Sequence, residues 1–324
     1  MRAIRRILVA VKDPGARSLP AVAKAIQLAR ALGAQLELFH AIDSPYYVDM
    51  LAMNADRTRR TECDQRSEYL QRLGRIAARA RLHAPQVSVA VEWDYPSYEA
   101  ILRRAQRMRA DLIVAECHAG RRFAPGLLRL ADWELLRLSP VPVLLVKRAR
   151  PYRHPRLLAA LDPSQAFAKP ASLDEEILRV GSSIAAALRG RLHAVHAYAA
   201  AAAPAKAIAG AVQTSAAQCA VVAGAGVGFE YALRSADVAA ARRHLVAGDP
   251  TAAVRDTARR VAADIVVAGA VSRSGLQRAF IGDTAERLLD CLSCDLLIVK
   301  PPQFVSLVPR AARGARLLAV EPLG

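Results

Sequence analysis

Short, uninterrupted apolar runs alternate along this chain with longer stretches in which apolar residues recur at helical spacing. Uninterrupted runs are typical of strands in a parallel sheet that helices cover on both faces. The longer stretches are typical of amphipathic helices, as in 18–32, where Leu19, Val22, Ala23 and Ile26 share one face. The pattern predicts strands near 6–12, 35–41, 87–92, 111–115 and 142–147, and again near 156–161, 191–197, 243–247, 264–268 and 296–300.

The alternation of strands and helices predicts an α/β fold. The helices of the first half are expected near 18–32, 59–83, 97–108 and 128–138. Strands joined by helices through short turns form doubly wound parallel sheets with right-handed crossovers. A length of 324 residues favours two such domains. We therefore expect two tandem Rossmann-like domains, each with about five strands and four helices.

The two halves of the sequence repeat each other. Four segments of the first half return in the second half, in the same order and at nearly constant separation. The matched segments are 6–14 with 156–163, 31–41 with 187–197, 110–115 with 263–268, and 143–147 with 296–300. Such agreement indicates a duplication. A basic, proline-bearing linker at 148–155 predicts domains at 1–150 and 151–303, followed by an unassigned tail at 304–324.

The composition is strongly basic, with 46 Lys and Arg against 29 acidic residues and a formal charge of +17. The arginines are spread over both halves and form no single block, which favours a solvated basic surface over nucleic-acid binding. The sequence shows no secretory leader and no run that resembles a membrane span. Five cysteines in a chain of this length do not predict a disulfide framework. These features predict a cytoplasmic protein with reduced thiols.

A glycine-bearing segment follows the fourth strand of the second half, where ligands bind in open α/β sheets. Its glycines would let the backbone approach an anion closely, and a helix that begins near Asp283 would offer free N–H groups. The residues that we consider as ligand contacts in this segment are Gly269, Ser272, Arg273, Gly275, Gly282, Asp283 and Thr284.

With the Asp-Pro pair that ends the first strand of each half, this segment resembles the universal stress protein family. Nucleotide-binding members of that family carry Gly-x2-Gly-x9-Gly-(Ser/Thr), a pattern that falls here on Gly269, Ser272, Gly282 and Asp283. The runs 132–137, 279–286 and 294–301 are similar to the tandem E-type subgroup. The resemblance implies domains like those of adenine nucleotide α hydrolases. It also implies an intramolecular pseudo-dimer in which Val143–Val146 and Leu296–Val299 pair; a homodimer of chains is left open.

The altered positions leave the identity of the ligand open. A carboxylate at Asp283 repels phosphate and competes for the helix N–H groups, although Arg273 and Arg278 could compensate in part. Binding of ATP or another adenine nucleotide, and binding of another small molecule, both remain open, so no cofactor is assigned. For Asp162, two interpretations are equally favoured: contact with a ligand, and formation of the turn after the strand.

The first domain has lost the glycine pattern, because Glu116 replaces the strand-end glycine. With Asp13, Glu116 is the counterpart of the second domain's site residues, and we expect the first domain to be structural or to bind something different. The long excursion at 199–241 contains Gly224, Gly226 and Gly228, for which a flexible connection is favoured over a ligand loop.

Other chemistry-bearing residues favour structural roles. Cys291 and Cys294 are expected at the end of a helix, which is the wrong end for a reactive thiol. His193 and His196 point to opposite faces of one strand and cannot share a metal, so a strand-end histidine with a hydrogen bond is the better interpretation. Cys117 with His118 has no third member for a catalytic set. No metal site and no catalytic residue is predicted.

The sequence thus predicts a non-enzymatic, cytoplasmic stress-response protein that binds a small molecule in its second domain. One alternative is an ATP-binding protein with slow ATPase activity. The other is a basic protein that associates with nucleic acid.

Overall fold

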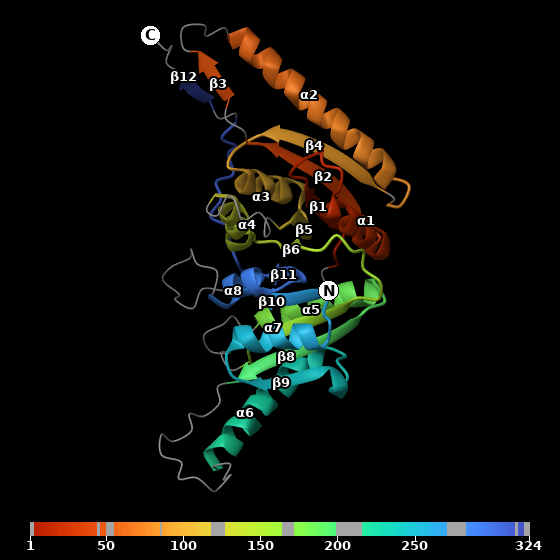
Figure 1. Cartoon of the computed structure of the whole chain (residues 1–324), viewed down its shortest axis with the longest axis vertical. Helices are drawn as coiled ribbons and strands as arrows, with labels where there is room; N and C mark the ends of the chain where they lie inside the picture. Colours follow the sequence, from red (N-terminus) through yellow and green to blue (C-terminus); the bar gives the residue numbers. More distant parts are fainter. Residues whose placement is uncertain are drawn as a thin grey trace. The chain divides into compact units, whose positions relative to one another are not determined.

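The computed structural model describes residues 3–43, 46–49, 55–84, 86–117, 127–163, 172–198, 216–270, 283–314 and 317–320. The chain forms two compact units (Figure 1). Unit 1 comprises Met1–Tyr152 together with Val305–Gly324, and unit 2 comprises Arg153–Phe304. Unit 2 is therefore inserted into unit 1, because the chain returns to unit 1 at its C-terminal end.

Unit 1 contains a parallel sheet with the strand order β4-β2-β1-β5-β6. Apolar runs with almost no exposed surface build the inner strands, as in Ile7, Leu8 and Val9. The strands are β1 (Arg6–Ala10), β2 (Gln35–Ile42), β4 (Val87–Trp93), β5 (Leu112–Glu116) and β6 (Val143–Val146). The helices are α1 (Pro20–Leu32), α2 (Ala55–Ala80), α3 (Ser97–Met108) and α4 (Leu127–Leu138).

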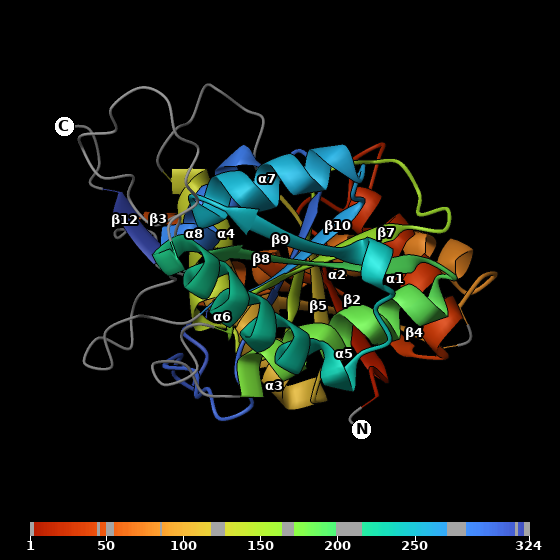
Figure 2. The same cartoon turned by 90° about the horizontal axis from the view of Figure 1, so that it is seen from below.

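Unit 2 repeats this sheet with the order β11-β10-β7-β8-β9, again parallel throughout. Its strands are β7 (Arg156–Leu161), β8 (Arg191–Tyr198), β9 (Arg243–Ala247), β10 (Ile265–Gly269) and β11 (Asp295–Val299). Its helices are α5 (Ser172–Ala187), α6 (Ala216–Ala232), α7 (Pro250–Arg260) and α8 (Asp283–Cys291), with short 3₁₀ turns η3 (Leu233–Ser235) and η4 (Ala240–Arg242). Figure 2 shows α7 on one face of β8 and β9, and α5 and α6 on the other.

The predicted α/β fold is confirmed. The predicted strands and the helices α1, α3 and α4 agree with the structure to within two residues, whereas the bounds of α2 differ by up to four. The strand order places a topological switch point between β1 and β5 in unit 1, and between β7 and β10 in unit 2. At such a point, crossovers leave in opposite directions and open a crevice at the carboxyl ends of the strands.

The repeated Ala-Asp pairs have a structural role. Asp111 accepts a hydrogen bond from the backbone N–H of Arg6 (3.0 Å), and Asp264 accepts one from the backbone N–H of Arg156 (2.9 Å). The guanidinium of each arginine donates to a carbonyl near the C-terminal end of a helix, at Met108 in unit 1 and just beyond α7 in unit 2. Cations in this position satisfy the carbonyls that a helix end leaves without partners. These hydrogen bonds therefore stabilise the pairing of β1 with β5 and of β7 with β10.

The interpretation of the glycine cluster at 224–228 as a flexible connection is wrong, and so is its alternative as a ligand loop. These residues lie inside helix α6. The surrounding alanines have the highest helix propensity of any residue, which offsets the cost of three glycines. Close packing adds to this, since a Cβ on Gly228 would lie 3.6 Å from Pro163 at the end of β7.

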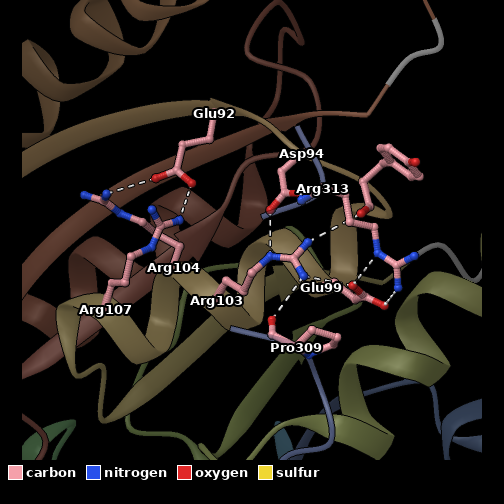
Figure 3. Close-up of polar contacts among 9 residues, drawn as sticks. Glu92, Asp94, Glu99, Arg103, Arg104, Arg107, Pro309 and Arg313 are labelled. Atoms are coloured by element: carbon pink, nitrogen blue, oxygen red, sulfur yellow. Dashed lines mark hydrogen bonds and ion pairs between the residues drawn. The ribbon is translucent and has the colours of Figure 1, made fainter. Parts of the chain in front are cut away.

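The C-terminal tail contributes to unit 1. Strand β12 (Leu317–Val320) pairs in parallel with β3 (Tyr46–Asp49), and neither strand is among those predicted. Figure 3 shows the contacts of the preceding segment, in which Arg313 approaches Glu99 and Pro309 approaches Arg103. The tail is thus an integral part of unit 1.

Candidate functional site

The sequence-predicted site residues that the structure describes lie at the carboxyl-end edge of the sheet in unit 2. Asp162 follows β7, and Gly269 is the last residue of β10. Because β7 and β10 are neighbours at the switch point, both residues lie at the sheet edge where ligands bind in open α/β folds. Asp283 and Thr284 begin helix α8, as predicted. Ser272, Arg273, Gly275 and Gly282 lie outside the described residues.

Close packing explains why residue 269 is a glycine. A Cβ on Gly269 would lie 2.6 Å from Cδ2 of Leu173, which is fully buried near the start of α5. Ile177, one turn further along α5, would be 3.1 Å away. The first turn of α5 therefore sits directly on the end of β10, and only glycine leaves room for it. The backbone N–H of Asp162 donates to Oδ1 of Asp174 in the same turn, at 3.4 Å.

His196 carries the most unusual polar atom of this edge. Its ring is 1% exposed, and its Nδ1 lies 3.2 Å from the carbonyl oxygen of Leu161, the last residue of β7. Since a carbonyl can only accept, Nδ1 carries a proton, and in the neutral ring Nε2 is therefore an acceptor. Among the residues that the structure describes, Nε2 of His196 is the buried side-chain nitrogen or oxygen without a hydrogen-bond partner. The ring packs against Phe229 of α6, with centroids 5.9 Å apart.

His40 occupies the matched position in unit 1. Its Nδ1 lies 2.8 Å from the carbonyl oxygen of Val11, just beyond β1, and its ring packs at 4.5 Å against Tyr69 of α2. Burial lowers the pKa of His40, against the opposing effects of its bond to Val11 and of nearby Asp43 and Asp13. The expectation of a strand-end histidine with a hydrogen bond is thus confirmed for His196, and His40 shows the same arrangement.

The matching edge of unit 1 uses its carboxylates internally. Oδ1 of Asp13 accepts a hydrogen bond from the backbone N–H of Gly15 at 2.7 Å, which closes an Asx turn. Oε1 of Glu116 accepts one from the backbone N–H of Ala21 at 3.4 Å, in the first turn of α1. That helix has no capping side chain of its own, so the Glu116 carboxylate stands where an anionic ligand would bind.

Beside this edge, the tail completes a buried charge network (Figure 3). The guanidinium of Arg103 is 2% exposed and donates to Asp94 at 2.7 Å and to Glu99 at 2.9 Å. Arg313 donates through its backbone N–H to Asp94 at 2.8 Å, and its guanidinium binds both oxygens of Glu99 at 2.9 and 3.0 Å. The carbonyl of Pro309 accepts from Arg103 at 3.3 Å. Glu99 thus binds two guanidinium groups, and Asp94 binds one guanidinium group and one backbone N–H.

The remaining sequence candidates have structural surroundings. Helix α8 ends at Cys291, so the two cysteines of that region flank the helix end and the start of β11, as predicted. His193 bonds to His244 and not to His196. Within the described ranges, no group of three or more His, Cys, Asp or Glu side chains is placed to hold a metal. None of the helices described there has the length and hydropathy of a membrane span.

Comparisons with known proteins agree with the duplicated architecture. The model of the universal stress protein family matches residues 3–147 and again residues 157–300. The chain therefore belongs to the universal stress protein family, as a tandem of two of its domains.

Individual relatives share the full tandem. The chain is similar to Universal stress protein E of Escherichia coli (strain K12), with 27% identity over 313 residues that cover 92% of this chain and 94% of the relative. A homolog of that protein from Haemophilus influenzae is 29% identical over 225 residues, covering 65% of this chain and 69% of the relative. The fold is also similar to a universal stress protein of Pseudomonas aeruginosa UCBPP-PA14, with a TM-score of 0.71 and 24% identity over 93% of this chain and 94% of that one.

Sequence reasoning missed the network around Arg103 and the docking of the tail. One signal was present, since Asp94 lies two residues after the predicted strand 87–92, and Glu99 and Arg103 lie four residues apart in the next predicted helix. The partner from the tail could not be inferred, because contacts across more than 200 residues leave no local pattern.

Proposed function

We propose that this chain is a non-enzymatic stress-response protein that binds a small molecule at the carboxyl-end edge of unit 2. The observation that carries the proposal is the buried acceptor at Nε2 of His196. Leaving such an atom without a partner costs about 1–3 kcal/mol, and native proteins rarely tolerate it without a reason. A ligand that donates an N–H or O–H group to this nitrogen would satisfy it.

The contrast between the two units supports a single site. In unit 1, Asp13 and Glu116 bind backbone groups of their own unit, and the tail binds Asp94 and Glu99 beside them. In unit 2, the glycine at the end of β10 survives and the histidine acceptor is unsatisfied. We infer that Asp162, Gly269 and the loop up to Thr284 surround the ligand in unit 2.

Native mass spectrometry of the purified full chain tests the proposal. We expect one small molecule per chain, lost in His196→Phe and retained in the matched unit 1 variant His40→Phe. Circular dichroism and thermal unfolding would establish that both variants fold. If the ligand is absent from all preparations, or depends on His40 and not on His196, the proposal fails. Recovery of ATP would identify the ligand as a nucleotide despite Asp283, and another molecule would exclude that identity.

A further inference from the structure

Two histidines meet near the amino-end edge of the sheet in unit 2, away from the proposed ligand site. Nδ1 of His193 in β8 lies 3.2 Å from Nε2 of His244 in β9. The rings are 8° from parallel, with centroids 5.5 Å apart. The centroid separation exceeds the nitrogen separation by about two ring radii, so the rings meet edge to edge. One shared proton therefore forms an N–H···N hydrogen bond between two neutral rings.

Arginines from four elements surround this pair. Arg156 and Arg191 begin β7 and β8 and are register partners, while Arg242 directly precedes β9 and Arg260 ends α7. Burial, followed by His244, Arg242, Arg156 and Arg191 in that order, lowers the pKa of His193 to about 4. Burial and then Arg260 lower the pKa of His244. The four positive charges thus act on one small area.

On the matching face of the sheet in unit 1, the positive charges are balanced by carboxylates. Glu37 stands at the position of His193 and binds the guanidinium of Arg104 in α3 through both oxygens, at 2.6 and 2.8 Å. Arg104 also donates to Glu92 at 3.1 Å, and Arg107 donates to Glu92 as well (Figure 3). Two carboxylates therefore neutralise two guanidinium groups on this face of unit 1.

The duplication allows the two faces to be matched position by position, using the repeated segments, the strand register and the Ala-Asp pairs. The set in unit 1 is Arg6, Gln35, Glu37, Ser88, Ala90, Glu92, Arg104 and Arg107. The set in unit 2 is Arg156, Arg191, His193, Arg242, His244, Val246, Thr257 and Arg260. Three arginines and two glutamates in unit 1 thus correspond to four arginines, two histidines and no acid in unit 2. Adjacent arginines without acids repel each other unless an anion lies between them.

We propose that this face of unit 2 binds a small anion that carries two or more phosphate groups. Arg191, Arg242 and Arg260 hold it, and the His193–His244 pair forms the floor of the site. Guanidinium groups match phosphate oxygens in a bidentate manner, which makes phosphate the fitting chemistry. The guanidinium of Arg156 already donates to the carbonyl of Val261 at 2.9 Å, so the role of Arg156 in the site is to add positive charge. The arginines all act on one pair of histidines, which favours a small anion over a nucleic-acid backbone.

Titration of the full chain with inorganic pyrophosphate tests this site. The variant Arg191→Gln/Arg242→Ser installs the unit 1 residues at two positions. Its control, Arg75→Gln/Arg79→Ser, removes the same charge from exposed positions of α2. We expect saturable binding that the site variant weakens at least tenfold and the control changes less than twofold. NMR signals of the His193 and His244 rings should shift on binding, while those of His196 should not.

Several results would overturn the proposal. Equal weakening in the site and control variants would show that pyrophosphate responds only to net charge. Absence of saturable binding would exclude the site, and so would binding of a short single-stranded oligonucleotide without binding of pyrophosphate. Shifts confined to His196 would place the anion at the carboxyl-end edge. The histidine signals therefore separate this proposal from the proposed function.

Discussion

At the scale of single residues, the duplication allows each residue of one unit to be compared with its counterpart in the other. His40 and His196 each bond to a backbone carbonyl at the end of the first strand of their unit, yet only His196 is left with a buried acceptor that lacks a partner in the described parts of the chain. Glu37 and His193 are likewise matched, and their exchange changes the charge of a whole face. Residues that differ between two copies of one fold therefore indicate where the units differ in function.

Gly269 tests whether the family's strand-end glycine serves packing in this chain. We expect Gly269→Ala to lower the free energy of unfolding of unit 2 by about 1–3 kcal/mol, because the added Cβ would overlap Leu173. Urea denaturation would measure the change. Gly224→Ala is the control, since a Cβ there meets nothing within 4 Å, and alanine should stabilise helix α6 by about 0.5–1 kcal/mol. Equal effects of the two substitutions would contradict the packing role of Gly269.

The lowered pKa of His193 predicts acid sensitivity. Its value is about 4 in the folded chain and 6.5 ordinarily, so the unfolded chain binds more protons between these two values. The free energy of unfolding should therefore fall as the pH falls through this window. Urea midpoints between pH 7 and pH 4 would show the loss, and His193→Gln should flatten its slope. A variant with the same pH dependence as the original chain would refute this assignment.

At the scale of elements, the strands of the two repeated sheets could be predicted, whereas β3, β12 and helix α6 could not. Short apolar runs that alternate with amphipathic stretches indicate parallel strands, and the predicted bounds of β7 and β9 are those of the structure. Helix α6 was misjudged because glycine is a poor helix former, and its contact with Pro163, beyond the end of β7, leaves no local pattern in the sequence. The ligand residues in the loop after β10 stay predictions, because most of them lie outside the described residues.

Helix α3 offers a sharp test of the buried network. We expect Arg103→Leu to lower the free energy of unfolding by about 3–5 kcal/mol, since it leaves Asp94 and Glu99 buried without their shared cation. Arg107→Leu, one turn further along α3, should cost less than about 1 kcal/mol, because Arg107 is half exposed. Thermal unfolding of both variants measures the difference. Similar losses of stability in the two variants would show that the burial of the network does not determine its contribution to the free energy of unfolding.

At the scale of the whole molecule, unit 1 is completed only by the end of the chain. Contacts that join Arg103 and Asp94 to the tail span 206 and 219 residues. Along the sequence, unit 2 separates the two segments of unit 1, so unit 1 is completed only after the residues of unit 2. The tail thus supplies hydrogen-bond donors to the carboxylates of unit 1. Among the residues described, no comparable segment does so in unit 2.

Removal of residues 305–324 should therefore affect one unit selectively. We expect faster hydrogen exchange in α3 and β4, which lose Arg313, Pro309 and the pairing of β12 with β3 beside them. Exchange in β7, β8 and β10 should remain as in the full chain. Mass spectrometry of peptide fragments would report both regions. Uniform acceleration across the two units would contradict the assignment of the tail to unit 1.

The central claim, that unit 2 binds a small molecule through His196, is tested most directly by the ¹⁵N resonances of the histidine rings. Spectra of the protein as purified should be compared with those after unfolding, removal of small molecules and refolding. We predict that Nδ1 of His196 carries the proton in both samples and that the Nε2 resonance moves between them, while His40 stays constant. An unchanged Nε2 resonance, or a change at His40 alone, would contradict the claim.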